Sequence, residues 1–155
     1  MNPPDFIRKY SLAIILSTEY TPLFPSVAIA QAALETGWGE STIDEANNMF
    51  GIKATGDTNE YWKGDKVLAT TTEAGQGIVQ QWFRAYHSLS DSIKDHANLL
   101  ITLSRYDVVL AAKTPEEQAV ALQNAGYATS PNYANSLISI INKYNLKEYD
   151  KKKNL

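Results

Sequence analysis

The stretch Val27–Ser41, VAIAQAALETGWGES, decides how the rest of the chain is arranged. Its first half is made of small and apolar residues at spacings that place them on one face of a helix, which indicates a helix deep in a domain. Glu35 follows in the last helical turn, and the segment Gly37-Trp38-Gly39 then ends the helix and leaves open space beside the carboxyl group. The apolar stripe consists of Val27, Ala30, Ala33 and Leu34.

The position of Glu35 at the end of this helix predicts a raised pKa. Backbone carbonyl dipoles and nearby apolar groups both disfavour a negative charge there. A carboxyl group with a raised pKa keeps its proton near neutral pH, as a general acid must. Local chemistry leaves two interpretations open: Glu35 is such an acid, or it is a solvated glutamate at a helix end.

Several further blocks follow this stretch in a fixed order. Together they resemble glycoside hydrolase family 73, the bacterial N-acetylglucosaminidases that include flagellar and autolytic peptidoglycan hydrolases. The resemblance covers roughly residues 5–146, and the number of blocks makes it specific. The blocks are Gln31–Ser41, Asn47–Lys53, Phe83–Tyr86, Ser88 with Asp91-Ser92, Asp95-His96 and Gly126–Thr129.

The resemblance implies a lysozyme-like, mainly α (α+β) domain with a small antiparallel β-hairpin lobe flanking the cleft. It implies endo-acting cleavage of the β-1,4 bond after N-acetylglucosamine in peptidoglycan, with Glu35 as proton donor. The alternatives are a muramidase or lytic transglycosylase on the same fold, or a non-catalytic module that binds the cell wall.

Glycoside hydrolysis ordinarily requires a second carboxyl group. The candidates after Glu35 are Asp57, Glu60, Asp65 and Glu73. Related enzymes place a second glutamate on the β-lobe at a similar chain distance, so the resemblance assigns the role to Glu73, with Glu60 as the alternative.

Further site residues come mainly from the same resemblance. It implies that Tyr127 lies near the reacting sugar, with Tyr133 as a weaker candidate. It also places Asn48 beside the acid, where an amide can bind sugar hydroxyl or acetamido groups. For Phe50 we favour the core over a sugar platform, whereas Trp62 either stacks on a sugar or packs the small sheet.

Sequence patterns predict the remaining elements. His96 is expected to be a hydrogen-bonded core residue, because no second metal ligand lies at motif spacing. In the N-terminal part, the patterns predict an amphipathic helix at Asp5–Ser17 with Phe6, Tyr10, Ala13, Ile14 and Leu16 buried, and a short helix at Ile43–Ala46 capped by Ser41 or Thr42. The middle part is expected to form a hairpin or three-stranded lobe from Val67–Thr72 and Ile78–Tyr86, followed by a helix from about Ser90. The C-terminal part is expected to contain a helix from Thr114-Pro115 to Ala125, a last helix starting at Ser130-Pro131, and a frayed polar tail from Lys147.

The composition is that of a globular protein. A chain of 155 residues with 44% hydrophobic and 20% charged residues predicts one domain, with its core at about 5–146. The net charge of −3 gives no support for nucleic-acid binding, and the absence of cysteines excludes disulfides and thiolate metal sites. Nothing calls for a cofactor or a metal.

Membrane insertion is not expected, because no apolar run approaches the roughly 20 residues that cross a bilayer. The first apolar run, Leu12–Leu16, is short and lacks a secretory cleavage site. Met1 therefore begins a mature domain, an unexported phage-type enzyme or a shortened chain. We expect a monomer that acts on peptidoglycan glycan strands at the bacterial cell wall.

Overall fold

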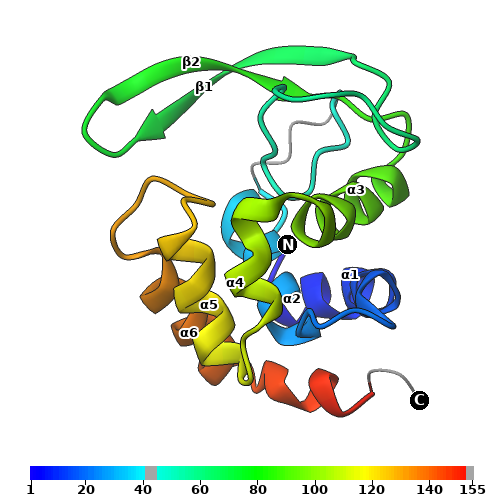
Figure 1. The fold of residues 1–155 in the computed structure, drawn as a ribbon, viewed down its shortest axis with the longest axis vertical. Coiled ribbons are helices and arrows are strands. Elements are labelled where there is room, and N and C mark those ends of the chain that lie inside the picture. Colours follow the sequence, from blue (N-terminus) through cyan, green and yellow to red (C-terminus); the bar gives the residue numbers. More distant parts are fainter. Residues whose placement is uncertain (41–44, 153–155) are drawn as a thin grey trace.

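Helix α2 (Pro25–Thr36) is the central element of the computed structural model, which describes residues 1–40 and 45–152 (Figure 1). Ten of its 12 residues are buried, and their small side chains let neighbouring helices approach closely. Gly37 ends the helix in the left-handed conformation with φ 55°, as predicted. The elements packed around it are α1 (Pro3–Thr18), α5 (Pro115–Asn124), α6 (Tyr133–Lys143) and the 3₁₀ helix η2 (Leu146–Lys152).

The predicted N-terminal amphipathic helix is confirmed as α1, but the face that it buries differs from the predicted one. Asn2 caps it by accepting a hydrogen bond from the Asp5 N–H. The prediction that Leu16 is buried was wrong, because its side chain is 55% exposed; Tyr10 is half-buried and Ala13 is exposed. The buried residues are Phe6, Ile7, Ile14, Ile15 and Thr18, which share one stripe at helical spacing.

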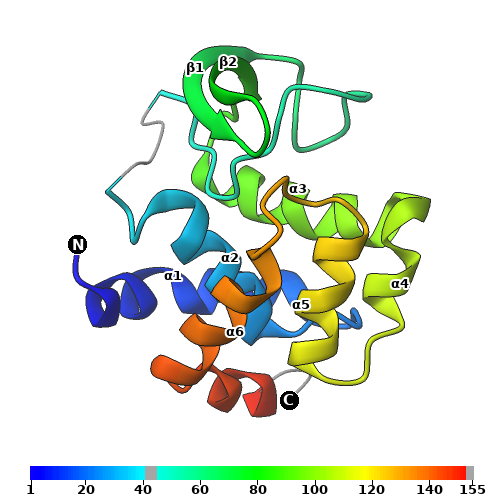
Figure 2. The ribbon, with the colours of Figure 1, turned by 90° about the vertical axis from the view of Figure 1, so that its left-hand side faces the viewer.

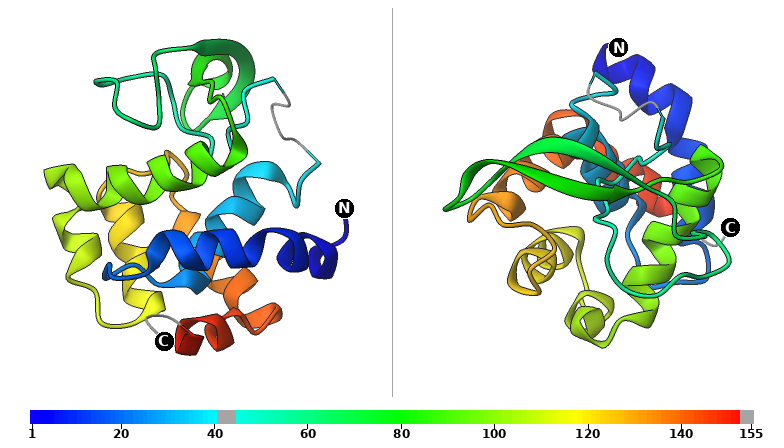
Figure 3. Two further views of the ribbon diagram at one scale, coloured as in Figure 1. Left: turned by 90° about the vertical axis from the view of Figure 1, so that its right-hand side faces the viewer. Right: turned by 90° about the horizontal axis from the view of Figure 1, so that it is seen from above.

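The predicted β-lobe is a two-stranded antiparallel hairpin of β1 (Lys66–Glu73) and β2 (Gly77–Arg84). It arches over the helical body (Figures 2 and 3). A third segment contributes only an isolated bridge between Lys53 and Phe83. Burial alternates along β1, with Glu73 on the more buried face, so strand periodicity directs its side chain toward the body.

A buried polar cluster joins this lobe to helix α3 (Leu89–Thr102). Asp95 is fully buried and accepts hydrogen bonds from Arg84, at 2.9 Å, and from Tyr86 and Asn59. The guanidinium group of Arg84 lies 4.0 Å above the Trp62 ring. Because a buried charge is costly unless it is paired and hydrogen-bonded, this cluster ties the base of the lobe to the body in one arrangement.

The C-terminal part departs from prediction in two places. Thr114 caps α5 as expected, but Ser130-Pro131 do not start the last helix, which begins at Tyr133 after a turn. The prediction of a frayed tail was wrong through Lys152, since η2 packs against α2.

Two contacts with the rest of the domain hold the C-terminal segment in place. Leu146 is fully buried. Asp150 accepts hydrogen bonds of 2.8 Å from both the N–H and the hydroxyl of Ser26. Ser26 lies in the first turn of α2, and the helix dipole stabilises a carboxylate at that end.

Two other segments complete the chain between the predicted elements. The 3₁₀ helix η1 (Ser104–Tyr106) and the short helix α4 (Asp107–Leu110) follow α3 and were not predicted. The helix predicted at Ile43–Ala46, with its caps at Ser41 and Thr42, lies largely outside the described residues; residues 45–47 form a turn. In the part of the chain that the structure describes, no helix is both long and apolar enough to span a membrane.

Candidate active site

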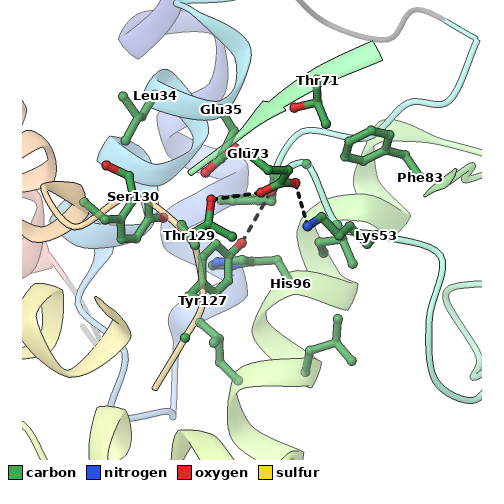
Figure 4. A pocket seen from close by; sticks show the side chains of 18 of the residues that line it. Leu34, Glu35, Lys53, Thr71, Glu73, Phe83, His96, Tyr127, Thr129 and Ser130 are labelled. Carbon is green, nitrogen blue, oxygen red and sulfur yellow. Dashed lines mark hydrogen bonds and ion pairs between the residues drawn. The ribbon is translucent and has the colours of Figure 1, made fainter. Parts of the chain in front are cut away.

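A pocket of about 500 Å³ lies between the helical body and the hairpin (Figure 4). Its walls come from the end of α2, the segment 50–53, strand β1, helix α3 and the connection between α5 and α6. The structure brings five of the predicted site residues to this pocket from distant parts of the sequence. They are Glu35, Phe50, Glu73, Tyr127 and Tyr133.

Glu35 reaches the pocket from the last turn of α2, with its carboxyl group packed against Gly51. A β-carbon at position 51 would lie only 3.0 Å from a carboxyl oxygen of Glu35, and Gly51 has a φ of 62°, so both the space and the backbone favour glycine. Burial is the main reason that the pKa of Glu35 rises from 4.5 to about 7; the negative charge of Glu73 raises it further, and the positive charge of Lys53 lowers it.

Glu73 meets the opposite conditions at the end of strand β1. One carboxylate oxygen forms an ion pair of 2.6 Å with Lys53, and the other accepts a hydrogen bond of 2.8 Å from the Thr129 hydroxyl. The Lys53 hydrogen bond is the main cause that holds the pKa of Glu73 below its usual value, with the Thr129 hydrogen bond adding to it against the effect of burial.

Thr129 also fastens the tip of the hairpin to the helical body. Its hydroxyl oxygen accepts a hydrogen bond of 3.1 Å from the N–H of Ala74 while it donates to Glu73. Thr129 belongs to the connection between α5 and α6, so these two bonds close one side of the pocket. The bond to Glu73 is drawn in Figure 4.

The two carboxyl groups therefore differ in protonation near neutral pH. Glu35 retains its proton for much of the time, and Glu73 is ionised. Pairs of carboxyl groups whose environments push their pKa values apart can divide the work of a general acid and of a base, nucleophile or electrostatic stabiliser. This arrangement can carry out hydrolysis of a glycosidic bond.

Aromatic rings form the floor of the pocket beneath these carboxyl groups. Tyr127 stacks on Tyr133 with ring centroids 5.8 Å apart, and its hydroxyl donates to the Phe50 carbonyl at 3.4 Å. Phe50 is almost completely buried and stacks on His96 at 3.7 Å, in keeping with a core residue that also borders the pocket.

A buried hydrogen-bonded chain supports this floor from below. The Gln31 amide donates to the Tyr133 hydroxyl at 3.0 Å, and its oxygen lies 2.9 Å from the His96 ring nitrogen. Burial lowers the pKa of His96 to about 3, so the ring is neutral at physiological pH. His96 is therefore the hydrogen-bonded core residue that the sequence predicted.

Three other candidates lie away from the pocket. Both amide groups of Asn48 are occupied by backbone, donating to the carbonyls of Ile52 and Arg84 and accepting from the Ile52 N–H. Trp62 is buried within the lobe and donates to the Asp65 carbonyl, which supports packing over sugar stacking. Glu60, the alternative second carboxylate, is exposed and does not border the pocket.

No site role was predicted from the sequence for Lys53, Thr129 or Gln31. Lys53 and Thr129 each end one of the blocks that carry the family resemblance, and Gln31 begins another. Their place in these blocks was the sequence feature that could have marked them as site residues. Among the described residues, no three histidine, cysteine, aspartate or glutamate side chains gather where they could hold a metal ion.

Comparison with known proteins agrees with the family resemblance seen in the sequence. The family model described as mannosyl-glycoprotein endo-beta-N-acetylglucosaminidase matches residues 11–146. The peptidoglycan hydrolase FlgJ of Salmonella typhimurium is 43% identical over 145 residues, which are 88% of this chain and 45% of that protein. The exo-glucosaminidase LytG of Bacillus subtilis is 40% identical over 147 residues, or 89% of this chain and 50% of LytG.

The chain thus spans about half the length of these curated relatives. The solved glycoside hydrolase domain of Salmonella typhimurium FlgJ matches it with a TM-score of 0.72 and 39% identity, over 98% of this chain and 94% of that domain. This similarity confirms the predicted lysozyme-like fold.

Proposed function

The chain belongs to the glucosaminidase family, glycoside hydrolase family 73, and on that premise we propose that it is a peptidoglycan hydrolase. Its reaction is the endo-acting hydrolysis of the β-1,4 bond between N-acetylglucosamine and N-acetylmuramic acid. The observation that carries this proposal is the pair Glu35 and Glu73, which border one pocket with opposite shifts in pKa.

In the proposed reaction, Glu35 donates its proton to the glycosidic oxygen as the bond to the N-acetylglucosamine carbon breaks. Positive charge then develops on that sugar, and the ionised carboxylate of Glu73 stabilises it or takes a proton from the attacking water. Glu35 is a carboxylate once its proton has left with the departing oxygen. The water oxygen then bonds to the anomeric carbon, and the proton that the water loses goes to Glu73 or, where Glu73 only stabilises the charge, back to Glu35. The pKa of Glu35, about 7, suits a group that must be protonated before the bond breaks and deprotonated after it.

Tyr127 is proposed to position the reacting sugar. Its ring borders the pocket beside the acid, and its stacking on Tyr133 restricts the orientation of the ring. A hydroxyl held in this way can bind the acetamido group of the sugar or favour the developing positive charge. Tyr133 and Phe50 support this ring from the protein side.

A second candidate is exo-acting release of N-acetylglucosamine from strand ends. The relative LytG, which carries that activity in its name, and the contact between Thr129 and the hairpin tip, which closes one side of the pocket, both favour it. An exo-acting enzyme gives single sugars from the beginning of the reaction, whereas an endo-acting enzyme first shortens long strands.

Product analysis on purified peptidoglycan tests the bond and the mode of cleavage together. Mass spectrometry of early and late products is expected to give internal fragments with reducing N-acetylglucosamine ends. Reducing N-acetylmuramic acid ends would instead identify a muramidase, and anhydro ends a lytic transglycosylase. A protein that binds cell walls but gives no new ends would be a non-catalytic module.

The place of action follows from the substrate. We propose that this domain acts as a monomer, without metal or cofactor, on glycan strands of the bacterial cell wall, either in the periplasm or outside the cell. The similarity to FlgJ and LytG supports that location.

A further inference from the structure

The two cations that border the pocket in the described part of the chain, Lys53 and Arg105, differ in their partners. Lys53 is ion-paired with Glu73 at 2.6 Å. Arg105 forms no ion pair with any carboxylate of residues 1–40 and 45–152. A positive group is thus available to a ligand at this wall of the pocket.

The side chain of Arg105, in η1, is exposed and lies against its neighbour Tyr106. Its guanidinium carbon is 4.7 Å from the centre of the Tyr106 ring, and Tyr106 itself is buried. Contact with an aromatic face leaves the edge of a planar guanidinium group able to bind a ligand. That edge matches the two oxygens of a carboxylate.

An aromatic row connects Arg105 to the proposed reaction centre. The Tyr106 ring lies 6.1 Å from that of Tyr127, and Tyr127 lies 5.8 Å from Tyr133. All three tyrosines border the same pocket as Glu35. A glycan strand seated over Tyr127 therefore carries its neighbouring substituents toward Arg105.

We propose that Arg105 binds a carboxylate carried on the O3 substituent of a muramic acid residue in the strand. This proposal rests on the proposed function and specifies its substrate. The O3 lactyl group ends in a free carboxylate where the stem peptide has been removed, and otherwise bears a peptide with carboxylates of its own. A glycan of N-acetylglucosamine alone has neither group.

Charge balance gives the reason for such a contact. The chain has a net charge of −3, so an anionic strand meets repulsion as it approaches, and the positive charge of Lys53 is already paired with Glu73. A guanidinium group at the pocket wall offsets this repulsion where the carboxylate arrives. It also favours muramic acid over a neutral sugar at that position.

The test measures binding in the Glu35→Gln background, so that the ligands are not cleaved. Three oligosaccharides of equal length are titrated by calorimetry: a peptide-bearing peptidoglycan fragment, the same fragment after removal of its peptides, and an oligomer of N-acetylglucosamine. Arg105→Gln is expected to weaken binding of a muramic acid ligand about tenfold relative to the neutral oligomer, which corresponds to about 1.4 kcal/mol.

The pattern of losses identifies the source of the carboxylate. A selective loss confined to the peptide-bearing ligand assigns the stem peptide, and one confined to the stripped ligand assigns the lactyl group; a selective loss for both shows that either carboxylate is bound. An equal change for all three ligands, or no change, overturns the proposal.

Arg8→Gln is the matched control, since it removes the same charge from the exposed face of helix α1, where Arg8 pairs with Asp5 outside the pocket. It should leave the ratio of affinities unchanged, and an equal shift from Arg8→Gln would attribute the effect to net charge and overturn the proposal. Cleavage of whole peptidoglycan by the wild-type chain is assayed separately. Absence of products there rejects the hydrolase, whereas normal cleavage with an unaltered Arg105→Gln binding ratio rejects only the carboxylate contact.

Discussion

The helical body and the β-hairpin each supply one carboxyl group to the same pocket, and the two regions treat it in opposite ways. In the body, Glu35 ends a buried helix and packs against Gly51, and its pKa rises to about 7. On the hairpin, Glu73 is held by Lys53 and Thr129, and its pKa falls. The same side chain becomes an acid in one region and an anion in the other.

Packing is the main cause of the pKa of Glu35, whereas specific partners are the main cause of the pKa of Glu73. The raised pKa of Glu35 comes mainly from desolvation, because its carboxyl group lies at the end of a buried helix. The lowered pKa of Glu73 depends mainly on a single cation. Substitutions that remove one cause at a time test this contrast between the two carboxyl groups.

The largest expected effect is on catalysis by Glu35→Gln. An amide of the same shape cannot donate the proton, so we expect kcat on purified peptidoglycan to fall by about 10³-fold. Binding of cell walls should change little, because the pocket keeps its shape. Equal release of reducing ends by the wild type and the variant would contradict the assignment of Glu35 as the acid.

The same substitution should stabilise the protein at high pH. The pKa of Glu35 is higher in the folded state than in the unfolded chain. As the pH rises from 4.5 to about 7, the unfolded chain therefore releases this proton while the folded protein keeps it, and the folded protein loses stability. Glu35→Gln lacks this penalty. We therefore expect its free energy of unfolding to exceed that of the wild type at pH 8 by about 3 kcal/mol, at about 1.36 kcal/mol per pKa unit.

Urea unfolding of both proteins at pH 4.5 and pH 8 measures this difference. At pH 4.5 the carboxyl group is protonated in the folded protein and still half protonated in the unfolded chain, so the gap should be much smaller there. Glu60→Gln is the control, because Glu60 is exposed. A gap that stays constant with pH would show that Glu35 is not desolvated.

A smaller loss is expected from Glu73→Gln, which keeps the shape of the side chain but removes its negative charge and the ion pair with Lys53. We expect kcat to fall by about 10²-fold, within the range of one catalytic carboxylate. Glu60→Gln is the comparison, since Glu60 is the other carboxylate considered from the sequence and should retain wild-type kcat. A loss below tenfold for Glu73→Gln would favour a route in which the acetamido oxygen of the substrate acts as nucleophile.

The smallest expected effect is a shift of the pH profile in Lys53→Met. The proposed mechanism requires an ionised Glu73 and a protonated Glu35, and Lys53 lowers the pKa of both groups. Without this cation both values rise, so both limbs of the profile of kcat/KM should move to higher pH by about one unit.

Two further variants control the Lys53 prediction. Lys53→Arg should retain most of the wild-type profile, because it keeps the positive charge. Lys63→Met removes a charge from an exposed lysine that does not border the pocket, and should cause no shift. A shift of the same size in Lys63→Met would attribute the effect to the net charge of the lobe.

Short-range patterns explain which parts of the fold were predictable. Three features depend on neighbouring residues and were predicted near their observed positions. They are helix α2 with Glu35 before Gly37, the Thr114 cap of α5, and the hairpin whose first strand ends at Glu73. The start of α6 and the face of α1 that contains Leu16 were missed. At both places the local sequence pattern is compatible with more than one helix start or more than one buried helix face.

Periodicity, caps and turns act over a few residues, so the sequence was enough to predict the hairpin and most of the helices, though not η1 or α4. The contacts between distant groups depend on tertiary packing: Lys53 and Thr129 with Glu73, Asp150 with Ser26, and Asn48 with the backbone. These partners are from 4 to 124 residues apart in the chain, and all but the Asn48–Ile52 pair depend on how whole elements pack. Burial and ion pairing, which set the two pKa values, arise only from that packing.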